Sequence, residues 1–356
     1  MEIKLELLPP EKRRKLDLEG DLPFGCIFTD HMFLMYYQEG KGWYDAQIKP
    51  YEPICLDPAA TVFHYSQTIF EGLKAYYGVD GRIRLFRPER NMARMNYSAK
   101  RMCMPAIDKE FALHAIKTLV DLEKGWIPKE IGSALYIRPV LMGTEAFLGV
   151  KPSSEYIFFI ILSPVGAYYK EGFNPIKIYV TDKYVRAVPG GVGDVKTGGN
   201  YAASLMASEE AAKLGYTQVL WLDAIERRYV EEVGTMNIFF YFEDELVTPA
   251  LTGTILPGIT RESVIQMAKD WGLKVNERRI TIDEVIEGAE TGRLKECFGT
   301  GTAAVISPVG YLAYKGKEYV INQGQTGPLA QRLFEELTGI QYGEKPDPYG
   351  WIQFVP

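Results

Sequence analysis

The sequence of 356 residues has few of the residues that build metal clusters or disulfide frameworks. It contains four cysteines and three histidines, and no two cysteines form a C-x-x-C pair. These counts argue against a zinc site and against a disulfide-stabilised scaffold. We therefore expect no bound metal ion and reduced cysteine thiols.

Long apolar runs and an excess of positive charge are also lacking. The longest apolar run is IFFIIL, residues 157–162, which is far too short to span a bilayer. Residues 1–20 mix acidic and basic side chains without an apolar centre, which argues against a secretory signal. A net charge of −6 and a pI near 5.4 provide no basic surface for nucleic acid or for an anionic membrane. We expect a cytoplasmic protein whose partners are small molecules.

The chain does have enough apolar and aromatic side chains for packed cores, with 47% hydrophobic and 13% aromatic residues. Its length exceeds what one core usually serves, so we expect two domains. Prolines and glycines interrupt regular structure between residues 163 and 175, which places the change of domain there. The expected fold class is α/β and α+β, with a small α+β domain over residues 1–168, a linker over 169–182 and a larger domain over 183–356.

Periodicity gives a coarse assignment of helices and strands. Apolar residues at helical spacing predict helices over 111–126, over 201–214 and from Thr260 to Gly272. Short apolar runs bounded by turn residues predict strands over 134–142, 156–162, 176–182, 217–223, 237–242 and 245–250. The helix at Thr260 follows the turn Leu256-Pro257-Gly258, so the free N–H groups of its first turn should point out of a tight bend.

The segment VPGGVGDVKTGGNY, residues 188–201, sets one lysine among five glycines. That much backbone freedom is typical of a sharp turn or of a close approach to another molecule. A solvated surface turn is one interpretation. A phosphate loop is disfavoured, because Gly190 to Thr197 matches G-x-x-x-x-G-K-[ST] except at Val195, and valine resists the positive φ that glycine permits. The third interpretation makes Lys196 an amine that condenses with the aldehyde of pyridoxal phosphate.

Pyridoxal phosphate needs an acid beside its pyridine nitrogen and donors around its phosphate. Glu231 and Glu232 precede a glycine turn and an apolar strand, and one of the two should face inward, although tandem glutamates are also typical of a solvated edge. The helix start at Ile259 and Thr260 and the turn GTGTAAV, residues 299–305, are candidate anion sites. The arginine for the phosphate remains open among Arg87, Arg90, Arg94 and Arg101.

Together these segments resemble the branched-chain aminotransferases, which are fold type IV, class IV pyridoxal-phosphate-dependent enzymes. Seven blocks are similar to that family's motifs in the same order: HYSQTIFEGLKAY, FRPERNMARM, LYIRPVLMG, GDVKTGGNY, EVGTMNIFF, LPGITRES and GTGTAAV. The resemblance implies a two-domain fold like that of D-amino acid aminotransferase, with the cofactor at the domain interface, and a homodimer. The redox-active C-x-x-C of the mammalian members falls here on Ala304 and Ser307, so thiol regulation of that kind is not expected.

The resemblance also implies roles for particular residues. Lys196 would form a Schiff base with the cofactor and then move the substrate proton, and Glu232 would pair with the pyridine nitrogen. The other residues implied for cofactor binding are Tyr201 at the ring oxygen, Thr235 near the phosphate, and Arg94, Ile259, Thr260 and Thr302 on the phosphate. Those implied for substrate binding are Thr302 and Ala303, through their N–H groups, with Tyr65, Phe70, Tyr136, Tyr201 and Arg138 around the side-chain pocket.

The implied reaction is transamination of L-leucine, L-isoleucine and L-valine with 2-oxoglutarate, which gives branched-chain 2-oxo acids and L-glutamate. An apolar pocket suits the three branched substrates, while Arg138 or tyrosine hydroxyls suit the second carboxylate of glutamate. A D-amino acid aminotransferase and an aminodeoxychorismate lyase share this scaffold and remain alternatives. The substrate-side blocks FEGLKAY and LYIRPVLMG favour the branched-chain enzyme.

Overall fold

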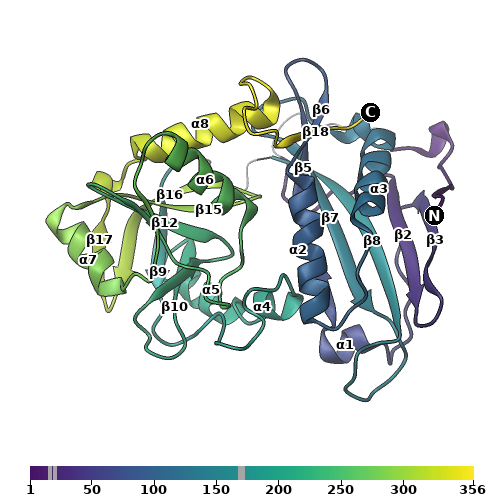
Figure 1. Cartoon of the computed structure of the whole chain (residues 1–356), viewed down its shortest axis with the longest axis horizontal. Helices are drawn as coiled ribbons and strands as arrows, with labels where there is room; N and C mark the ends of the chain where they lie inside the picture. The colour runs from purple at the N-terminus through teal and green to yellow at the C-terminus, as the bar shows by residue number, and fades with distance from the viewer. Residues whose placement is uncertain (15–17, 19–21, 167–172) are drawn as a thin grey trace. The chain divides into compact units, whose positions relative to one another are not determined.

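A computed structural model describes residues 1–14, 18, 22–166 and 173–356, and Figure 1 shows its helices and strands. The chain forms two compact units. Unit 1 comprises Met1–Tyr168, Val195–Gly198 and Gly339–Pro356, and unit 2 comprises Tyr169–Asp194 and Gly199–Thr338. The start of the expected linker, residues 169–172, lies outside the described residues.

Unit 1 is built on a sheet whose strand order is β1-β3-β2-β8-β7-β5-β6-β18, with β4 paired to β7. Its pairings are antiparallel except that of β1 with β3. The strands are β1 (Lys4–Leu5), β2 (His31–Gln38), β3 (Gly42–Pro50), β4 (Thr68–Phe70), β5 (Leu73–Tyr77), β6 (Ile83–Phe86), β7 (Ala134–Gly143), β8 (Glu155–Val165) and β18 (Ile352–Phe354). The strands predicted over 134–142 and 156–162 are thus confirmed as β7 and β8.

The helices of unit 1 are α1 (Thr61–Tyr65), α2 (Pro88–Arg101) and α3 (Lys109–Leu122), with 3-10 turns at Pro10–Lys12 and Lys124–Trp126. Figure 1 shows α2 and α3 packed together along one face of the sheet. The predicted helix over 111–126 is confirmed as α3 with different bounds. It begins earlier because the Asp108 side chain accepts a hydrogen bond from the N–H of Phe111 and caps the first turn.

Unit 2 has a sheet of order β11-β10-β9-β16-β15-β12-β13-β14, with β17 paired to β16. Because β11 also lies against β12, the sheet curls upon itself. The strands are β9 (Ile176–Val180), β10 (Gln218–Leu222), β11 (Val230–Val233), β12 (Asn237–Phe242), β13 (Leu246–Thr248), β14 (Val275–Glu277), β15 (Leu294–Gly301), β16 (Val305–Tyr314) and β17 (Lys317–Val320). The helices are α4 (Gly198–Ala202), α5 (Leu205–Lys213), α6 (Ile259–Asp270), α7 (Ile282–Thr291) and α8 (Pro328–Tyr342), with a 3-10 turn at Asn322–Gly324. The last residues of α8, from Gly339 onward, belong to unit 1.

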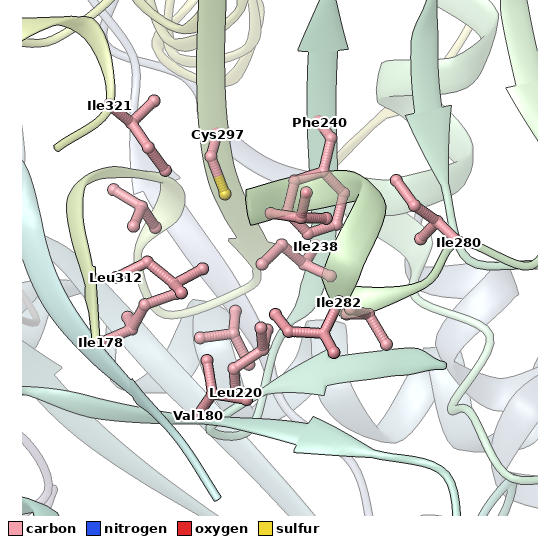
Figure 2. Packing of buried hydrophobic residues seen from close by; sticks show 14 of the residues in the cluster. Ile178, Val180, Leu220, Ile238, Phe240, Ile280, Ile282, Cys297, Leu312 and Ile321 are labelled. Carbon is pink, nitrogen blue, oxygen red and sulfur yellow. The ribbon is translucent and has the colours of Figure 1, made fainter. Parts of the chain in front are cut away.

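The core of unit 2 collects aliphatic side chains from this curled sheet (Figure 2). Ile178, Leu220, Ile238 and Leu312 come from β9, β10, β12 and β16, and all four are buried. In Figure 2 they converge with Ile282 at the start of α7. Full burial of each such side chain stabilises the fold by roughly 1.5–3 kcal/mol. The packing therefore fixes the strand ends and turns that carry the polar groups described below.

One predicted helix is two in the structure. The helix expected over 201–214 is broken after α4, and α5 starts only at Leu205. The Ser204 hydroxyl donates to the carbonyl of Tyr201 at 2.7 Å, and such side-chain bonds compete with the helical backbone bonds. Gly215, at φ 83°, follows α5, as expected. No helix in the described part of the chain is both long and apolar enough to cross a membrane.

The division of the chain also differs from the expected domains. Residues 176–180, expected in the linker, form β9, which pairs in parallel with both β10 and β16. The last residues, 339–356, were expected in the second domain but belong to unit 1. They return there because β18 pairs with β6 and the Tyr342 hydroxyl donates to the carbonyl of Ser133 at 2.8 Å.

Candidate active site

The backbone around Lys196 is held by unit 1. The N–H of Phe70 donates to the carbonyl of Lys196 at 3.0 Å, and the Thr197 hydroxyl donates to the carbonyl of Thr68 at 2.7 Å. On the other side, the N–H of Lys196 donates to the Ser98 hydroxyl at 3.2 Å. Val195 and Thr197 are buried. The part of the segment around Lys196 is therefore packed against other segments, whereas residues 188–190 are exposed.

The Lys196 amine lies over an aromatic ring. Its Nζ is 4.8 Å from the centre of the Phe70 ring, and the Arg138 guanidinium carbon is 4.7 Å from the same point. Arg138 also donates from Nη2 to the Tyr136 hydroxyl at 3.0 Å. A Cβ at Gly72 would lie 2.1 Å from that hydroxyl oxygen, so Tyr136 occupies space that only glycine leaves. Four of the predicted residues, Phe70, Tyr136, Arg138 and Lys196, thus form one cluster.

Arg94 is oriented by a glutamate that the sequence analysis did not single out. Its Nε and Nη2 donate to the two carboxylate oxygens of Glu71 at 2.8 and 2.9 Å, and Asn91 donates to Glu71 at 2.8 Å. Burial acts to raise the pKa of Glu71, but Arg94, with Lys196 and Asn91, outweighs it, so this pKa lies below its usual range. A bidentate contact of this kind fixes the plane of the guanidinium.

Tyr65 is placed differently from the other predicted pocket residues. It lies in α1, it is exposed, and its hydroxyl donates to the carbonyl of Leu148. The Tyr65 hydroxyl therefore bonds to the loop after β7, whereas Arg138 and Tyr136 bond to each other within the cluster.

In unit 2, three predicted cofactor residues border one small pocket. Tyr201 comes from α4, Glu232 from β11, and Thr235 from the turn that joins β11 to β12. The pocket is lined by Arg186, Asn200, Tyr201, Ser204, Glu232, Gly234, Thr235 and Leu256. Residues as far apart in the sequence as Arg186 and Thr235 thus offer a carboxylate, a guanidinium, an amide and hydroxyls to one space.

Glu232 is buried, at 2% exposure, and both of its carboxylate oxygens accept hydrogen bonds. Oε1 accepts from the N–H of Leu256 at 2.7 Å and from the Asn237 amide at 3.4 Å. Oε2 accepts from Arg186 Nε at 2.7 Å. A buried carboxylate that has a cation and an N–H donor is kept ionised. The arrangement offers a fixed negative charge at this end of β11.

Glu231 differs from its neighbour although it is also buried, at 5% exposure. Its Oε1 accepts from the Thr254 hydroxyl, while its Oε2 has no hydrogen-bond partner among the described residues. Burial raises the pKa of Glu231 to about 7, against the opposing effects of Thr254 and Arg186. We expected one glutamate of the pair to face inward, but both are buried. Their surroundings differ, because Glu232 has a cation beside it whereas the pKa of Glu231 is raised.

The start of α6 is joined to Glu232 by Asn237. The Asn237 amide nitrogen donates to the carbonyl of Leu256 at 2.9 Å. A Cβ at Gly258 would lie 1.9 Å from the amide oxygen of Asn237, so glycine permits this approach. In the described part of the chain, no side chain caps the helix at Gly258. The N–H groups of Ile259 and Thr260 therefore belong to a first turn of the kind that binds anions.

Thr302 and Ala303 lie in the turn between β15 and β16, where Gly301 pairs with Val305. Asn237 at the start of β12 pairs with Thr300 near the end of β15. The turn at 302–304 therefore lies at the same end of the sheet as the turn that carries Thr235. This end of unit 2 collects the predicted residues of four separate segments.

Glu71, Asn91, Arg186 and Asn237 were missed as functional residues. Each lies in or beside a segment that was singled out, and Glu71, Arg186 and Asn237 are polar side chains among apolar residues. That signal identifies a buried polar group but does not name its partner, because the partners are 5 to 68 positions away in the sequence.

The comparison with known proteins identifies the family of the chain. The model of the amino-transferase class IV family matches residues 68–311. Branched-chain-amino-acid aminotransferase 2 of Bacillus subtilis (strain 168) is 55% identical over 353 residues, which are 99% of this chain and 97% of that protein.

Solved structures of similar enzymes share the fold. A branched-chain aminotransferase from the thermophilic archaeon Thermoproteus uzoniensis, with norvaline, has a TM-score of 0.77 at 27% identity, over 92% of this chain and 100% of that one. The branched-chain amino acid aminotransferase from Escherichia coli has a TM-score of 0.73 at 26% identity, over 91% and 99% of the two chains. The chain therefore belongs to the class IV aminotransferases and, within them, to the branched-chain amino acid aminotransferases.

Proposed function

We propose that the protein is a pyridoxal-phosphate-dependent transaminase that exchanges the amino group between L-leucine, L-isoleucine or L-valine and 2-oxoglutarate. The observation that carries this proposal is the held lysine: Lys196 is tied by hydrogen bonds on both sides of its backbone, and its amine lies against Phe70. Membership of the branched-chain aminotransferases supports the choice of substrates.

The residues present fit pyridoxal phosphate. Glu232 is a buried carboxylate with a cation on one oxygen, which suits the partner of a protonated pyridine nitrogen. Arg94 and the uncapped start of α6 supply a cation and N–H donors of the kind that bind phosphate. When bound, this cofactor supplies an aldehyde carbon for the amino group and a ring that withdraws electrons from the substrate α-carbon.

Lys196 carries the chemical step in this proposal. Its Nζ would hold the aldehyde carbon of the cofactor. The free amine would take the proton from the substrate α-carbon and deliver it, within the same half-reaction, to the carbon that bears the cofactor's aldehyde, as a general base and then a general acid. The contacts of Phe70 and Ser98 with the Lys196 backbone keep Nζ in place during both roles.

The remaining residues bind and orient. Glu232 would hold the pyridine nitrogen, and Tyr201 the ring oxygen. We assign the phosphate to Arg94, Ile259, Thr260 and Thr302, with Thr235 nearby. We assign the substrate carboxylate to the N–H groups of Thr302 and Ala303, and the side-chain pocket to Tyr65, Phe70, Tyr136, Arg138 and Tyr201. The aromatic cluster offers apolar walls to leucine, and Arg138 offers a cation to the second carboxylate of glutamate.

We also propose that the protein is a cytoplasmic homodimer. Unit 1 exposes a group of apolar side chains on and near α1: Phe63 is 60% exposed, Leu148 62% and Val150 85%. A patch formed by such side chains would be typical of a protein interface. Cys26, Cys55 and Cys103 are exposed free thiols, which suits a reducing compartment. Light scattering on the purified protein tests the dimer, and a monomeric mass at micromolar concentration would refute it.

Replacing Lys196 with alanine should abolish turnover, because both the covalent anchor and the proton carrier are lost. The variant should still fold, since Val195 and Thr197 keep their buried places. Transamination of L-leucine with 2-oxoglutarate and a thermal melt measure the two effects. Lys183→Ala, at an exposed lysine, is the matched control and should behave as the native protein. Multiple turnover by the Lys196 variant would exclude the proposed role.

The two glutamates should respond differently to the same change. Glu232→Gln should keep some bound cofactor but lose much of its activity, because a neutral amide cannot hold the pyridinium proton by charge. Glu231→Gln should retain most activity, since its carboxyl is bonded to Thr254 rather than to Arg186. Steady-state kinetics and cofactor content measure both. If the Glu231 variant were the crippled one, the assignment between them is wrong.

Glu231 should also make stability depend on pH. Its folded-state pKa of about 7 lies above the ordinary 4.5, so the stabilisation from holding the proton is complete below about pH 4.5 and is lost as the pH rises through 7. Glu231→Gln lacks this titration. Relative to the native protein, its free energy of unfolding should therefore rise between pH 5 and pH 8, by on the order of 3 kcal/mol at most. Denaturant titrations at both pH values measure this, and a difference that is the same at both would contradict it.

The pocket should discriminate weakly among the branched substrates. Each missing methylene in an apolar pocket is worth roughly 1–3 kcal/mol, or about 10- to 200-fold in kcat/KM. L-Leucine, L-isoleucine and L-valine should all react, and L-alanine should be slower by orders of magnitude. D-Alanine should fail, because its α-hydrogen would not face Lys196 while its carboxylate reached Thr302 and Ala303. Faster turnover of D-alanine than of L-leucine would make the protein a D-amino acid aminotransferase.

A further inference from the structure

One buried guanidinium in unit 2 contacts three segments of the candidate site. Arg186 lies after β9 and is buried. Its Nε pairs with Glu232 Oε2 at 2.7 Å, and its Nη1 donates to the carbonyls of Gly193 and Thr254 at 3.1 and 2.7 Å. We propose that Arg186 is a positioning residue for pyridoxal phosphate, which acts by holding the Glu232 carboxylate in the orientation that meets the pyridine nitrogen.

The contact with Arg186 fixes the orientation of the Glu232 carboxylate. Oε1 of Glu232 is taken by the N–H of Leu256, so a donor on Oε2 fixes the rotation of the whole carboxylate group. A charge-assisted bond from an arginine is shorter and stronger than one from a neutral donor. Without Arg186, the same carboxylate would be buried without its cation, which favours proton uptake or a turn of the side chain.

The two carbonyl contacts give Arg186 a fixed place of its own. Gly193 precedes Lys196 by three residues, and Thr254 precedes the turn that leads into α6. A Cβ at Gly193 would lie 2.6 Å from the carbonyl oxygen of Thr254, so these two backbone segments meet without room for a side chain. Nη1 joins them at this meeting point. Movement of Arg186 would therefore disturb both segments as well as Glu232.

The charges around Arg186 point to the same conclusion. Glu231 and Glu232 are adjacent on β11. Of these two residues, only Glu232 forms an ion pair with the Arg186 guanidinium, at 2.7 Å. Glu231 bonds instead to the Thr254 hydroxyl, and its raised pKa keeps it largely protonated below neutral pH. The single positive charge is therefore matched to the one carboxylate that borders the pocket with Tyr201.

The inference rests on the proposed function, and a double-mutant cycle on cofactor affinity tests it. The full chain is stripped of cofactor, pyridoxal phosphate is added back, and its Kd is measured by fluorescence for the native protein, Arg186→Met, Glu232→Gln and the double variant. Arg186→Met should weaken binding by about tenfold or more in the native background and by less than about threefold beside Glu232→Gln, because coupled residues are not additive. Arg186→Lys should restore part of the affinity, since an ammonium can still pair with Glu232.

Arg278→Met is the matched control, because Arg278 pairs with Glu245 and Glu284 in unit 2, away from the pocket residues. It should lower the melting temperature without changing the Kd. The kcat for L-leucine should fall in Arg186→Met more than its KM rises. Should Arg186→Met fail to fold, Arg186→Lys takes its place in the cycle. Equal losses in both backgrounds, or an unchanged Kd, would overturn the role of Arg186. Absence of any pyridoxal phosphate binding by the native protein would instead overturn the proposed function.

Discussion

The burial of ionised carboxylates is the constraint on which the candidate site depends. A carboxylate removed from water is stable only with a cation and further hydrogen bonds around it. Glu71 has Arg94 and Asn91, and Glu232 has Arg186 and the N–H of Leu256. Each ion pair also ties segments far apart in the sequence. The same contacts that remove the cost of burial therefore set the positions of the groups proposed to bind the cofactor.

Glycine serves the site where two groups approach too closely for a side chain. Gly72 leaves room for the Tyr136 hydroxyl, and Gly258 leaves room for the amide of Asn237. Neither needs a positive φ. At both positions the absence of a Cβ leaves space for a polar atom of a neighbouring segment to contact the backbone directly. Substitution at these positions would move a site residue even though the glycine itself has no chemistry.

Much of the fold could be predicted from periodicity, because long apolar strands and capped helices have strong local signals. The strands β7 and β8 and the helices α3 and α6 appear where their patterns indicated. The predictions failed where the structure depends on particular local or long-range contacts, which a sequence pattern does not show. The break before α5 depends on the Ser204 hydroxyl, and the return of β18 to unit 1 depends on a partner strand more than 250 residues earlier.

The sequence by itself singled out Lys196, since one lysine among five glycines is rare enough to be noticed. It also supplied the pair Glu231 and Glu232, and the resemblance to a family chose between them. Only the tertiary structure decided what surrounds each carboxyl: Arg186 faces Glu232, while Glu231 meets Thr254 and, with a pKa raised to about 7, holds its proton below neutral pH. The reason is physical. Residue type fixes which charges a chain can carry, but burial and the distance to a partner fix which of those charges persist.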